Sequence, residues 1–296
     1  MTAPASPSVT FGCSSLSPDA LQRFEFFDTL FDLSGEVLRP AYRCESLATE
    51  SKEMISPLVT AADRAVERVL REAIHHRFPT DGIVGEEEAP RAGSSLFEWV
   101  IDPIDGTSSL VRGLPLFGTL IGLIDKSSGT IVCGGADQPI LGERILARRG
   151  VPPRWNGAVA ANRHNASTPT NTALTDACVC ATTPLMFTTS AEQRVRDAVM
   201  NHCRRSAWGG DWFNYILMIG GKSTIPLVIV EAGLQFYDIC ALVPIIEEAG
   251  GVITNWDGEP ITESTTQVLA APNRALGEAL QQLVADARGT PQRRDV

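Results

Sequence analysis

Apolar residues in this chain recur at two spacings, and each spacing predicts a different kind of element. In several segments they return every three or four positions, which places them on one face of a helix. The first helix is expected to begin at Ser17-Pro18-Asp19, where a capping side chain precedes a proline and an acid, and to end near Pro40. The same pattern predicts helices over about 61–78, 191–203, 212–219, 237–248 and 273–287. Within residues 237–248, Pro244 is expected to bend the helix or to mark its first turn.

Shorter apolar runs bounded by glycine, proline or acidic residues predict strands. The clearest is Trp99-Val100-Ile101, which is typical of a buried strand. Other strands are expected at residues 83–84, 116–124, 131–133, 177–182, 225–230, 252–254 and 267–271, with a further pair at 137–138 and 143–147. Strands and helices mixed in this way, without an internal repeat, predict a layered α/β or α+β fold.

Polar stretches between these elements suggest how the chain is divided. Residues 149–172 are rich in loop-forming residues and contain Pro152-Pro153, which favours a boundary there. Residues 43–57 are polar and irregular, and we expect a mobile loop. The expected parts are a disordered tail at 1–17, a first half at 18–150, a second half at 151–288 and a tail at 289–296.

Composition and charge exclude several partners. The net charge is −10, which makes nucleic acid an unlikely partner. No apolar run reaches the roughly 18 to 20 residues that a membrane helix needs, and the first residues do not resemble a secretory signal. Seven cysteines without a CxxC pair suit a reducing compartment, so we expect a cytoplasmic protein. An acidic protein of this kind needs a local cation to handle an anionic substrate.

Candidate chemistry begins directly after the buried strand, at Asp102-Pro103-Ile104-Asp105-Gly106-Thr107. Two carboxylates crowded at a strand end repel one another unless something positive lies between them. A hard divalent cation supplies that charge.

Two other acids stand at similar places. Glu86 follows the short strand at 83–84, and Asp238 lies at the start of a helix. Each alone is typical of a surface loop, but together with Asp102 and Asp105 they fit an oxygen cage for Mg²⁺, completed by the Ile104 carbonyl. No cluster of His and Cys supports zinc.

Four motifs in this order resemble the inositol monophosphatase family of Mg²⁺-dependent phosphatases. They are Val59-Thr60-x-Ala62-Asp63, Gly85-Glu86-Glu87, Asp102 to Thr107, and Asp238 followed after ten residues by Ala249-Gly250-Gly251. The resemblance covers about residues 20–287. It implies an αβαβα sandwich and a homodimer.

Within that family the chain looks most similar to the histidinol-phosphate phosphatase branch. The resemblance rests on Arg112 to Leu120, Asp137-Gln138-Pro139, Gly209-Gly210-Asp211, Val230 to Leu234 and Tyr237-Asp238. Three positions depart from the branch: Ser108 replaces a common lysine, Trp208 a common tyrosine, and Ser56-Pro57-Leu58 a more acidic segment. These departures leave the substrate open.

The resemblance also implies a role for each motif. Two or three Mg²⁺ ions are expected on Glu86, Asp102, the Ile104 carbonyl, Asp105 and Asp238. Thr107 is expected to pair with Asp63 and orient the attacking water, with Glu87 holding a weaker metal or a water. Substrate contacts are expected from Gly106, Thr107, Ser108, Asp211 and Glu231.

Structural alternatives stay open for several of these residues. Thr107 can simply cap a helix, and Asp63 can be a first-turn acid favoured by the helix dipole. Asp211 and Glu231 can cap helix ends, although they could equally pair with a cationic amine on the substrate.

The implied reaction is hydrolysis of a small phosphate monoester by metal-activated water, with L-histidinol phosphate as the expected substrate in histidine biosynthesis. Inositol 1-phosphate is an alternative, as is a nucleotide or sugar bisphosphate. A metal-binding scaffold without turnover is the alternative that is not an enzyme.

Overall fold

The computed structural model describes residues 16–43, 49–51, 58–160, 173–220 and 223–289. Most of both expected tails, at 1–17 and 289–296, therefore lies outside the described residues. So does most of the expected loop at 43–57. Within it, strand β1 (Thr49–Ser51) is described, and it pairs with strand β2 (Leu58–Thr60), which follows the loop.

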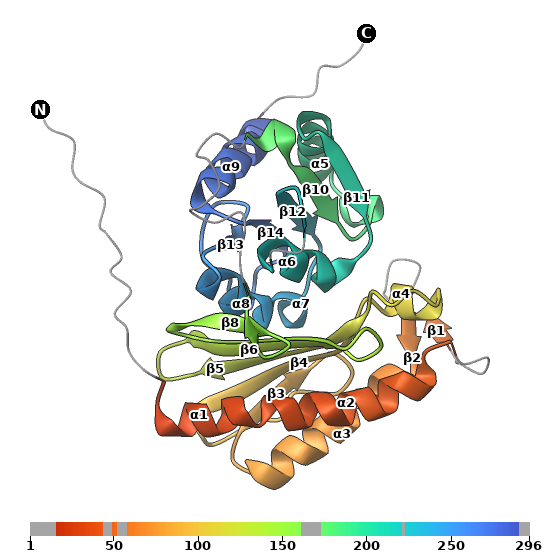
Figure 1. Cartoon of the computed structure of the whole chain (residues 1–296), viewed down its shortest axis with the longest axis vertical. Helices are drawn as coiled ribbons and strands as arrows, with labels where there is room; N and C mark the ends of the chain where they lie inside the picture. Colours follow the sequence, from red (N-terminus) through yellow and green to blue (C-terminus); the bar gives the residue numbers. More distant parts are fainter. Residues whose placement is uncertain (1–15, 44–48, 52–57, 161–172, 221–222, 290–296) are drawn as a thin grey trace, which may run out of the picture.

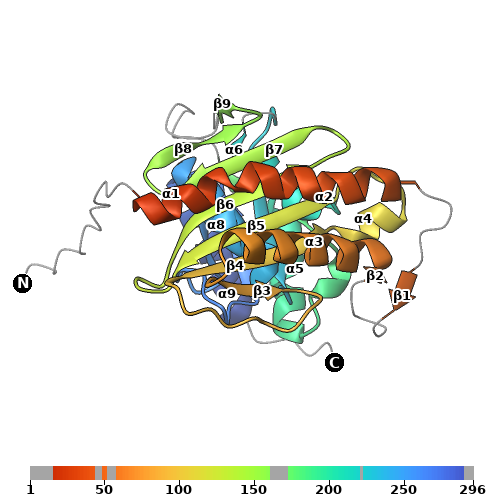
Figure 2. The same cartoon turned by 90° about the horizontal axis from the view of Figure 1, so that it is seen from below.

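The described chain forms five alternating layers of helices and sheets (Figure 1). Helices α1 (Pro18–Glu25), α2 (Phe27–Ala41) and α3 (Ala61–Arg77) cover one face of a seven-stranded sheet. Helices α2 and α3 lie side by side across that sheet (Figure 2). The predicted αβαβα sandwich is confirmed.

The seven-stranded sheet has the order β3-β4-β5-β6-β7-β8-β9. Strand β3 pairs in parallel with β4, and the other neighbours are antiparallel. Its strands are β3 (Gly82–Gly85), β4 (Phe97–Asp105), β5 (Gly118–Asp125), β6 (Thr130–Gln138), β7 (Glu143–Arg148), β8 (Val151–Trp155) and β9 (Ala158–Val159).

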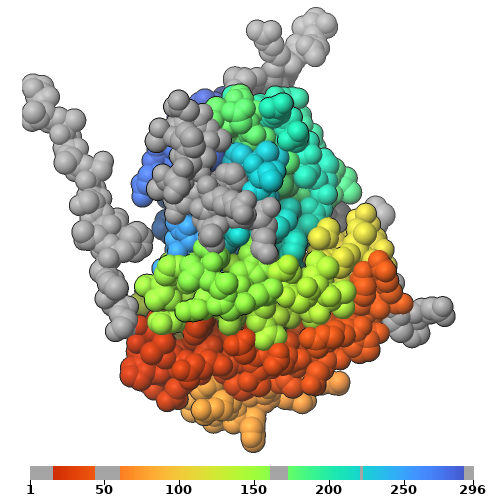
Figure 3. All heavy atoms as spheres, in the orientation of Figure 1, coloured from red at the N-terminus to blue at the C-terminus, as the bar shows by residue number. Residues whose placement is uncertain are grey.

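The second sheet is five-stranded, with the order β11-β10-β12-β14-β13. Helices α6, α7 and α8 lie between the two sheets, and α5 and α9 cover the outer face (Figure 1). Colour bands in the space-filling view follow the same order, from red helices at the base to teal and blue above (Figure 3). The elements are β10 (Cys178–Ala181), α5 (Ser190–His202), β11 (Arg205–Trp208), α6 (Asp211–Ile219), β12 (Leu227–Ala232), α7 (Phe236–Cys240), α8 (Leu242–Glu248), β13 (Val252–Asn255), β14 (Gln267–Ala271) and α9 (Arg274–Gly289). Short helices complete the set: α4 (Thr107–Val111) and the 3₁₀ turns Leu174–Asp176 and Pro184–Met186.

Strand β4 is buried on both faces, as its continuous apolar run predicts. Trp99 and Ile101 pack against the helices α1 to α3, while Val100 points into the layer between the sheets. The strand continues through the acidic motif to Asp105 rather than ending before it. A register irregularity between Asp102 and Asp105 interrupts its pairing with β5. Irregularities of this kind change where a side chain points.

Glycines let the middle helices lie directly on the first sheet. A side chain at Gly122 of β5 would meet Cys240 Sγ, and one at Gly134 of β6 would overlap with the Ala241 backbone. This close approach brings the end of α7, and with it Asp238, down onto strands β4 and β5.

Several element predictions were wrong in detail. The first helix is broken at Phe26 into α1 and α2, and it continues through Pro40 to Ala41. Residues 149–160 hold strands β8 and β9 instead of a loop, so the first sheet extends beyond residue 150. The remainder of the predicted loop at 161–172 lies outside the described residues.

Two further corrections concern the second half. The helix predicted over 237–248 is two helices, with the break at Ala241 and with Pro244 in the first turn of α8, where proline is tolerated. Strand β11 was not predicted, because Arg205 to Trp208 carries no apolar run.

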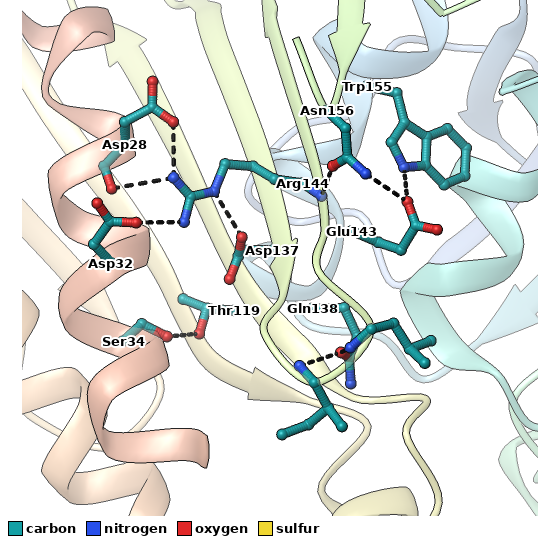
Figure 4. Close-up of polar contacts among 12 residues, drawn as sticks. Asp28, Asp32, Ser34, Thr119, Asp137, Gln138, Glu143, Arg144, Trp155 and Asn156 are labelled. Carbon is teal, nitrogen blue, oxygen red and sulfur yellow. Dashed lines mark hydrogen bonds and ion pairs between the residues drawn. The ribbon is translucent and has the colours of Figure 1, made fainter. Parts of the chain in front are cut away.

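Arg144 ties the first sheet to α2, as Figure 4 shows. Its guanidinium donates to Asp137 Oδ1 at 2.7 Å within the sheet and to Asp28 and Asp32 of α2, each at 2.8 Å. Asp137 is buried, and its Oδ2 has no hydrogen-bond partner among the described residues. Burial raises the pKa of Asp137, and Arg144 partly offsets that rise.

Replacing Arg144 by methionine should destabilise the fold by about 2 kcal/mol, because it leaves the Asp137 carboxylate buried without its cation. Urea unfolding measures the change. Arg274→Met is the control, since Arg274 lies in an exposed ion pair with Glu278, and this substitution should cost about 0 to 1 kcal/mol. Adding Asp137→Asn to Arg144→Met should recover stability; equal losses in both arginine variants would contradict this account.

Candidate active site

A cavity of about 510 Å³ opens between the two halves of the molecule. Strand β4 and the start of α4 line it from the first half, and α6, β12 and α7 from the second. All the predicted site residues except Asp63 and Glu87 line it, together with residues that were not predicted. The lining residues are Glu86, Asp102, Ile104, Asp105, Gly106, Thr107, Ser108, Thr182, Asp211, Trp212, Tyr215, Glu231, Gly233, Leu234, Gln235, Tyr237 and Asp238.

The cavity is strongly acidic. None of the described residues that line it is a lysine or an arginine. Asp102 and Glu231 are each 2% exposed, so little water is available to screen their charges. A cavity with this lining attracts cations.

The pKa values of three carboxyl groups report this crowding. Burial raises the pKa of Asp102, and the charges of Glu86, Asp105 and Asp238 raise it further. The pKa of Asp105 is raised by burial and then by nearby acids, while the backbone N–H of Trp212 opposes the rise. Burial raises the pKa of Asp238 to about 7, although the backbone N–H of Gln235 donates to its Oδ2 at 2.7 Å.

The Asp102 and Asp238 side chains interact, although they come from different halves of the chain, and this interaction lowers the pKa of Asp238 against the effect of burial. Asp102 Oδ1 is buried and has no hydrogen-bond partner among the described residues. A buried carboxylate oxygen without a donor costs free energy unless a cation approaches it.

The oxygen atoms that face this part of the cavity fit a hard divalent cation such as Mg²⁺, because such ions prefer oxygen ligands and several of these oxygens belong to buried carboxylates. Glu86, Asp102, Asp105 and Asp238 would hold it, with the Ile104 carbonyl. That carbonyl already accepts the Thr107 hydroxyl at 2.9 Å, but a carbonyl oxygen has a second lone pair. Among the described residues, no three His, Cys, Asp or Glu side chains converge as a finished metal site, so the cage stays a prediction.

Thr107 has two acceptors within reach of one proton. Its Oγ1 lies 2.9 Å from the Ile104 carbonyl and 3.3 Å from Asp63 Oδ1. Asp63 is 1% exposed and comes from the first turn of α3. The structure therefore brings Thr107 and Asp63 together, with the shorter bond going to Ile104.

Glu87 lies beside the cavity rather than in its lining. Its side chain is 2% exposed and lies 3.5 Å from the Arg64 guanidinium. An arginine this close satisfies part of its charge, so a direct contact with a metal is less favoured than for Glu86.

Asp211 and Glu231, here called the acidic wall, line the cavity beside the strand β4 motif. The Asp211 carboxylate lies next to Gly106, where an added Cβ would stand 3.1 Å from its Oδ2. Burial raises the pKa of Asp211 to about 6, while the side chains of Thr182 and Ser109 act to lower it. Burial likewise raises the pKa of Glu231.

Two residues that the sequence did not single out hold Glu231 in place. Thr182 donates its backbone N–H and its hydroxyl to Glu231 Oε1, each at 2.7 Å, and Tyr215 donates its hydroxyl to Oε2 at 2.6 Å. Thr182 ends a predicted strand and Tyr215 lies on the buried face of a predicted helix, so neither position carried a signal of its own.

The backbone at Asp211 is strained. Its φ of 41° follows Gly209 and Gly210, which also have positive φ. A residue with a side chain rarely adopts this region, and such outliers gather at functional sites. Here the conformation directs an acid into the cavity at the start of α6.

The chain is similar to proteins of known family in both sequence and structure. A model of the inositol monophosphatase family matches residues 22–288. The "Bifunctional phosphatase IMPL2, chloroplastic" of Arabidopsis thaliana is 38% identical, over 83% of this chain and 68% of that protein. A histidinol-phosphatase of Chlorobaculum parvum is 30% identical, over 85% of this chain and 92% of that protein. The solved structure of an inositol monophosphatase from Zymomonas mobilis is 34% identical, with a TM-score of 0.77, over 91% of this chain and all of that one.

Removing divalent metals should make stability depend on pH in a defined direction. Carboxyl groups with raised pKa values bind protons more tightly in the folded protein than in the unfolded chain. Stability should therefore fall as pH rises from about 4, the unfolded value, through about 6 and about 7, the values at Asp211 and Asp238. In the presence of a chelator, the melting temperature should be a few degrees higher at pH 5.5 than at pH 8.

Asp238→Asn should flatten this dependence, because it removes one of the two groups, whereas the exposed Asp176→Asn should leave it unchanged. A melting temperature that rises between pH 5.5 and pH 8 in all three proteins would contradict the assignment.

Proposed function

The chain belongs to the inositol monophosphatase family and is a phosphoric monoester hydrolase, and we propose that it hydrolyses L-histidinol phosphate to L-histidinol in histidine biosynthesis. The observation that carries the proposal is the acidic wall of Asp211 and Glu231, buried in a cavity whose described lining has no Lys or Arg. Histidinol phosphate carries an ammonium and an imidazole, while inositol phosphate offers only hydroxyl groups. Two buried carboxylates favour the cationic substrate.

The cavity lining holds candidate contacts for both parts of this molecule. The phosphate would lie against the Asp102 to Ser108 segment and its metal ions, and the amine and imidazole would lie toward the carboxyl groups of Asp211 and Glu231. Because Thr182 and Tyr215 donate to both oxygens of Glu231, its carboxyl group is held in one position before the substrate binds. Such preorganisation lowers the cost of binding.

Metal dependence is general in this family, and we propose two or three Mg²⁺ ions held by Glu86, Asp102, Ile104, Asp105 and Asp238. When bound, Mg²⁺ would neutralise the phosphate and lower the pKa of the attacking water. Thr107 would accept a hydrogen bond from that water while donating its own proton toward Asp63. Asp63, buried on α3, would take up the proton.

The alternatives are less well supported. A bisphosphatase needs basic residues for its second phosphate, and the described lining residues include none. An inositol phosphatase remains the alternative substrate class, since the Zymomonas mobilis structure carries that name. A scaffold without turnover is set aside, because the relatives are named as phosphatases.

Location and assembly are also proposals. A cytoplasmic location is supported by five buried free cysteines among the described residues. No helix in the described part of the chain is long and apolar enough to span a bilayer. A homodimer is proposed from the family alone.

Steady-state assays with Mg²⁺ should show about a hundredfold higher kcat/KM for histidinol phosphate than for inositol 1-phosphate, because the inositol part offers Asp211 and Glu231 no cation. Asp211→Asn should raise KM for histidinol phosphate at least about tenfold while changing the hydrolysis of glycerol 2-phosphate little. Asp176→Asn is the surface control. A hundredfold preference for inositol 1-phosphate, or equal losses on both monoesters, would overturn the substrate proposal.

A further inference from the structure

One buried acid close to the cavity has no part in the chemistry described above. Glu67 lies on α3, one turn after Asp63, and its side chain has no exposed area. Both of its oxygens point at the loop that follows β3. Oε2 accepts the backbone N–H of Glu87 at 2.7 Å, and Oε1 accepts that of Glu88 at 3.0 Å.

Arg71 completes the contact from the next turn of the same helix. Its Nε donates to Glu67 Oε1 at 2.7 Å, so the buried carboxylate is neutralised. Its two terminal nitrogens donate to the Glu88 carbonyl at 2.9 Å and to the Ala89 carbonyl at 3.3 Å. The side chains of helix α3 therefore hold the loop by bonding to both N–H and carbonyl groups of the loop backbone.

The fit is close enough to dictate the residue at the start of the loop. A Cβ at Gly85 would overlap with the Glu67 carboxylate, so a larger residue there would push that carboxylate out of its hydrogen bonds with the loop. Both Glu67 oxygens accept hydrogen bonds from the loop backbone, and Glu67 is not among the residues that line the cavity. Its contacts act on the backbone on either side of Glu86.

We propose that Glu67 and Arg71 are positioning residues that hold the Gly85–Ala89 loop in the conformation that presents Glu86 to the metal ions. The loop needs such support because Glu86 lies close to other acids. Its charge is one of those that raise the pKa of Asp102. Mutual repulsion pushes such carboxylates apart, and a loop held by four hydrogen bonds resists that push. The same helix carries Asp63, so one rigid element sets the loop and the Thr107 contact together.

The inference rests on the proposed metal site, and its test separates the two. Glu67→Gln keeps the shape of the side chain, but its amide group must face a backbone N–H or Arg71, so at least one hydrogen bond is lost. Titration with Mn²⁺, followed by electron paramagnetic resonance, should show a Kd raised about tenfold or more. At saturating Mg²⁺, kcat should recover, because the ligands themselves are intact.

Three other proteins complete the experiment. Glu72→Gln makes the same change at an exposed position of α3 and should leave the Mn²⁺ Kd unchanged. Arg71→Lys keeps the charge but cannot reach both carbonyls, and it should raise the Kd several-fold even if Glu67→Gln fails to fold. Asp105→Asn removes a proposed ligand and should abolish tight Mn²⁺ binding.

The outcomes distinguish the two ideas. If Asp105→Asn weakens Mn²⁺ binding but Glu67→Gln and Arg71→Lys bind Mn²⁺ as the wild type does, the positioning role is wrong and the metal site stands. If the wild-type protein itself binds no Mn²⁺, the proposed function fails. A lower melting temperature in Glu67→Gln with an unchanged Kd would assign the residue to stability alone.

Discussion

The repulsion among buried carboxylates in one cavity is the constraint on which the site depends. Asp102, Asp105 and Asp238 all have raised pKa values, and burial is the largest cause at each. Interiors tolerate such groups only when a proton, a cation or a set of donors compensates them. At Glu231 and Glu67 the protein supplies donors, whereas Asp102 Oδ1 has none among the described residues. This difference distinguishes the acids whose charge the protein itself compensates from those that we propose as ligands of a cation.

The fold assembles this cluster from both halves of the chain, and neither half could form it alone. The first sheet contributes Asp102 and Asp105 at the end of β4, and the second half contributes Asp238 from α7. Gly122 and Gly134 let the layer of α6 to α8 lie close against β5 and β6. The apolar core between the sheets, which includes Trp212 and Leu242, thus stabilises an arrangement that the carboxylates by themselves would oppose.

Much of the site could be predicted because its signals are local. The segment from Asp102 to Thr107 is contiguous, and the apolar run at Trp99 predicts the buried strand that carries it. The rest depends on tertiary contacts. In the sequence, Thr182 and Tyr215 carry no special signal, and Glu67 resembles any other helical acid. Their roles follow from tertiary contacts, in which Thr182 and Tyr215 donate to Glu231 and the loop backbone donates to Glu67. Strands β8 and β11 escaped prediction for a related reason, since Pro152-Pro153 and Arg205-Ser206 form strands only by pairing with neighbours.

The central claim is that these carboxylates form a site for divalent cations, and anomalous diffraction from crystals soaked in Mn²⁺ tests it most directly. The account predicts anomalous peaks in the cavity, bounded by Glu86, Asp102, Asp105, Asp238 and the Ile104 carbonyl. Distances of about 2.2 Å between the ion and its oxygen ligands are expected, as is typical of hard divalent ions. Saturating Mn²⁺ that gave no peak in this cavity, or peaks only elsewhere on the molecule, would contradict it.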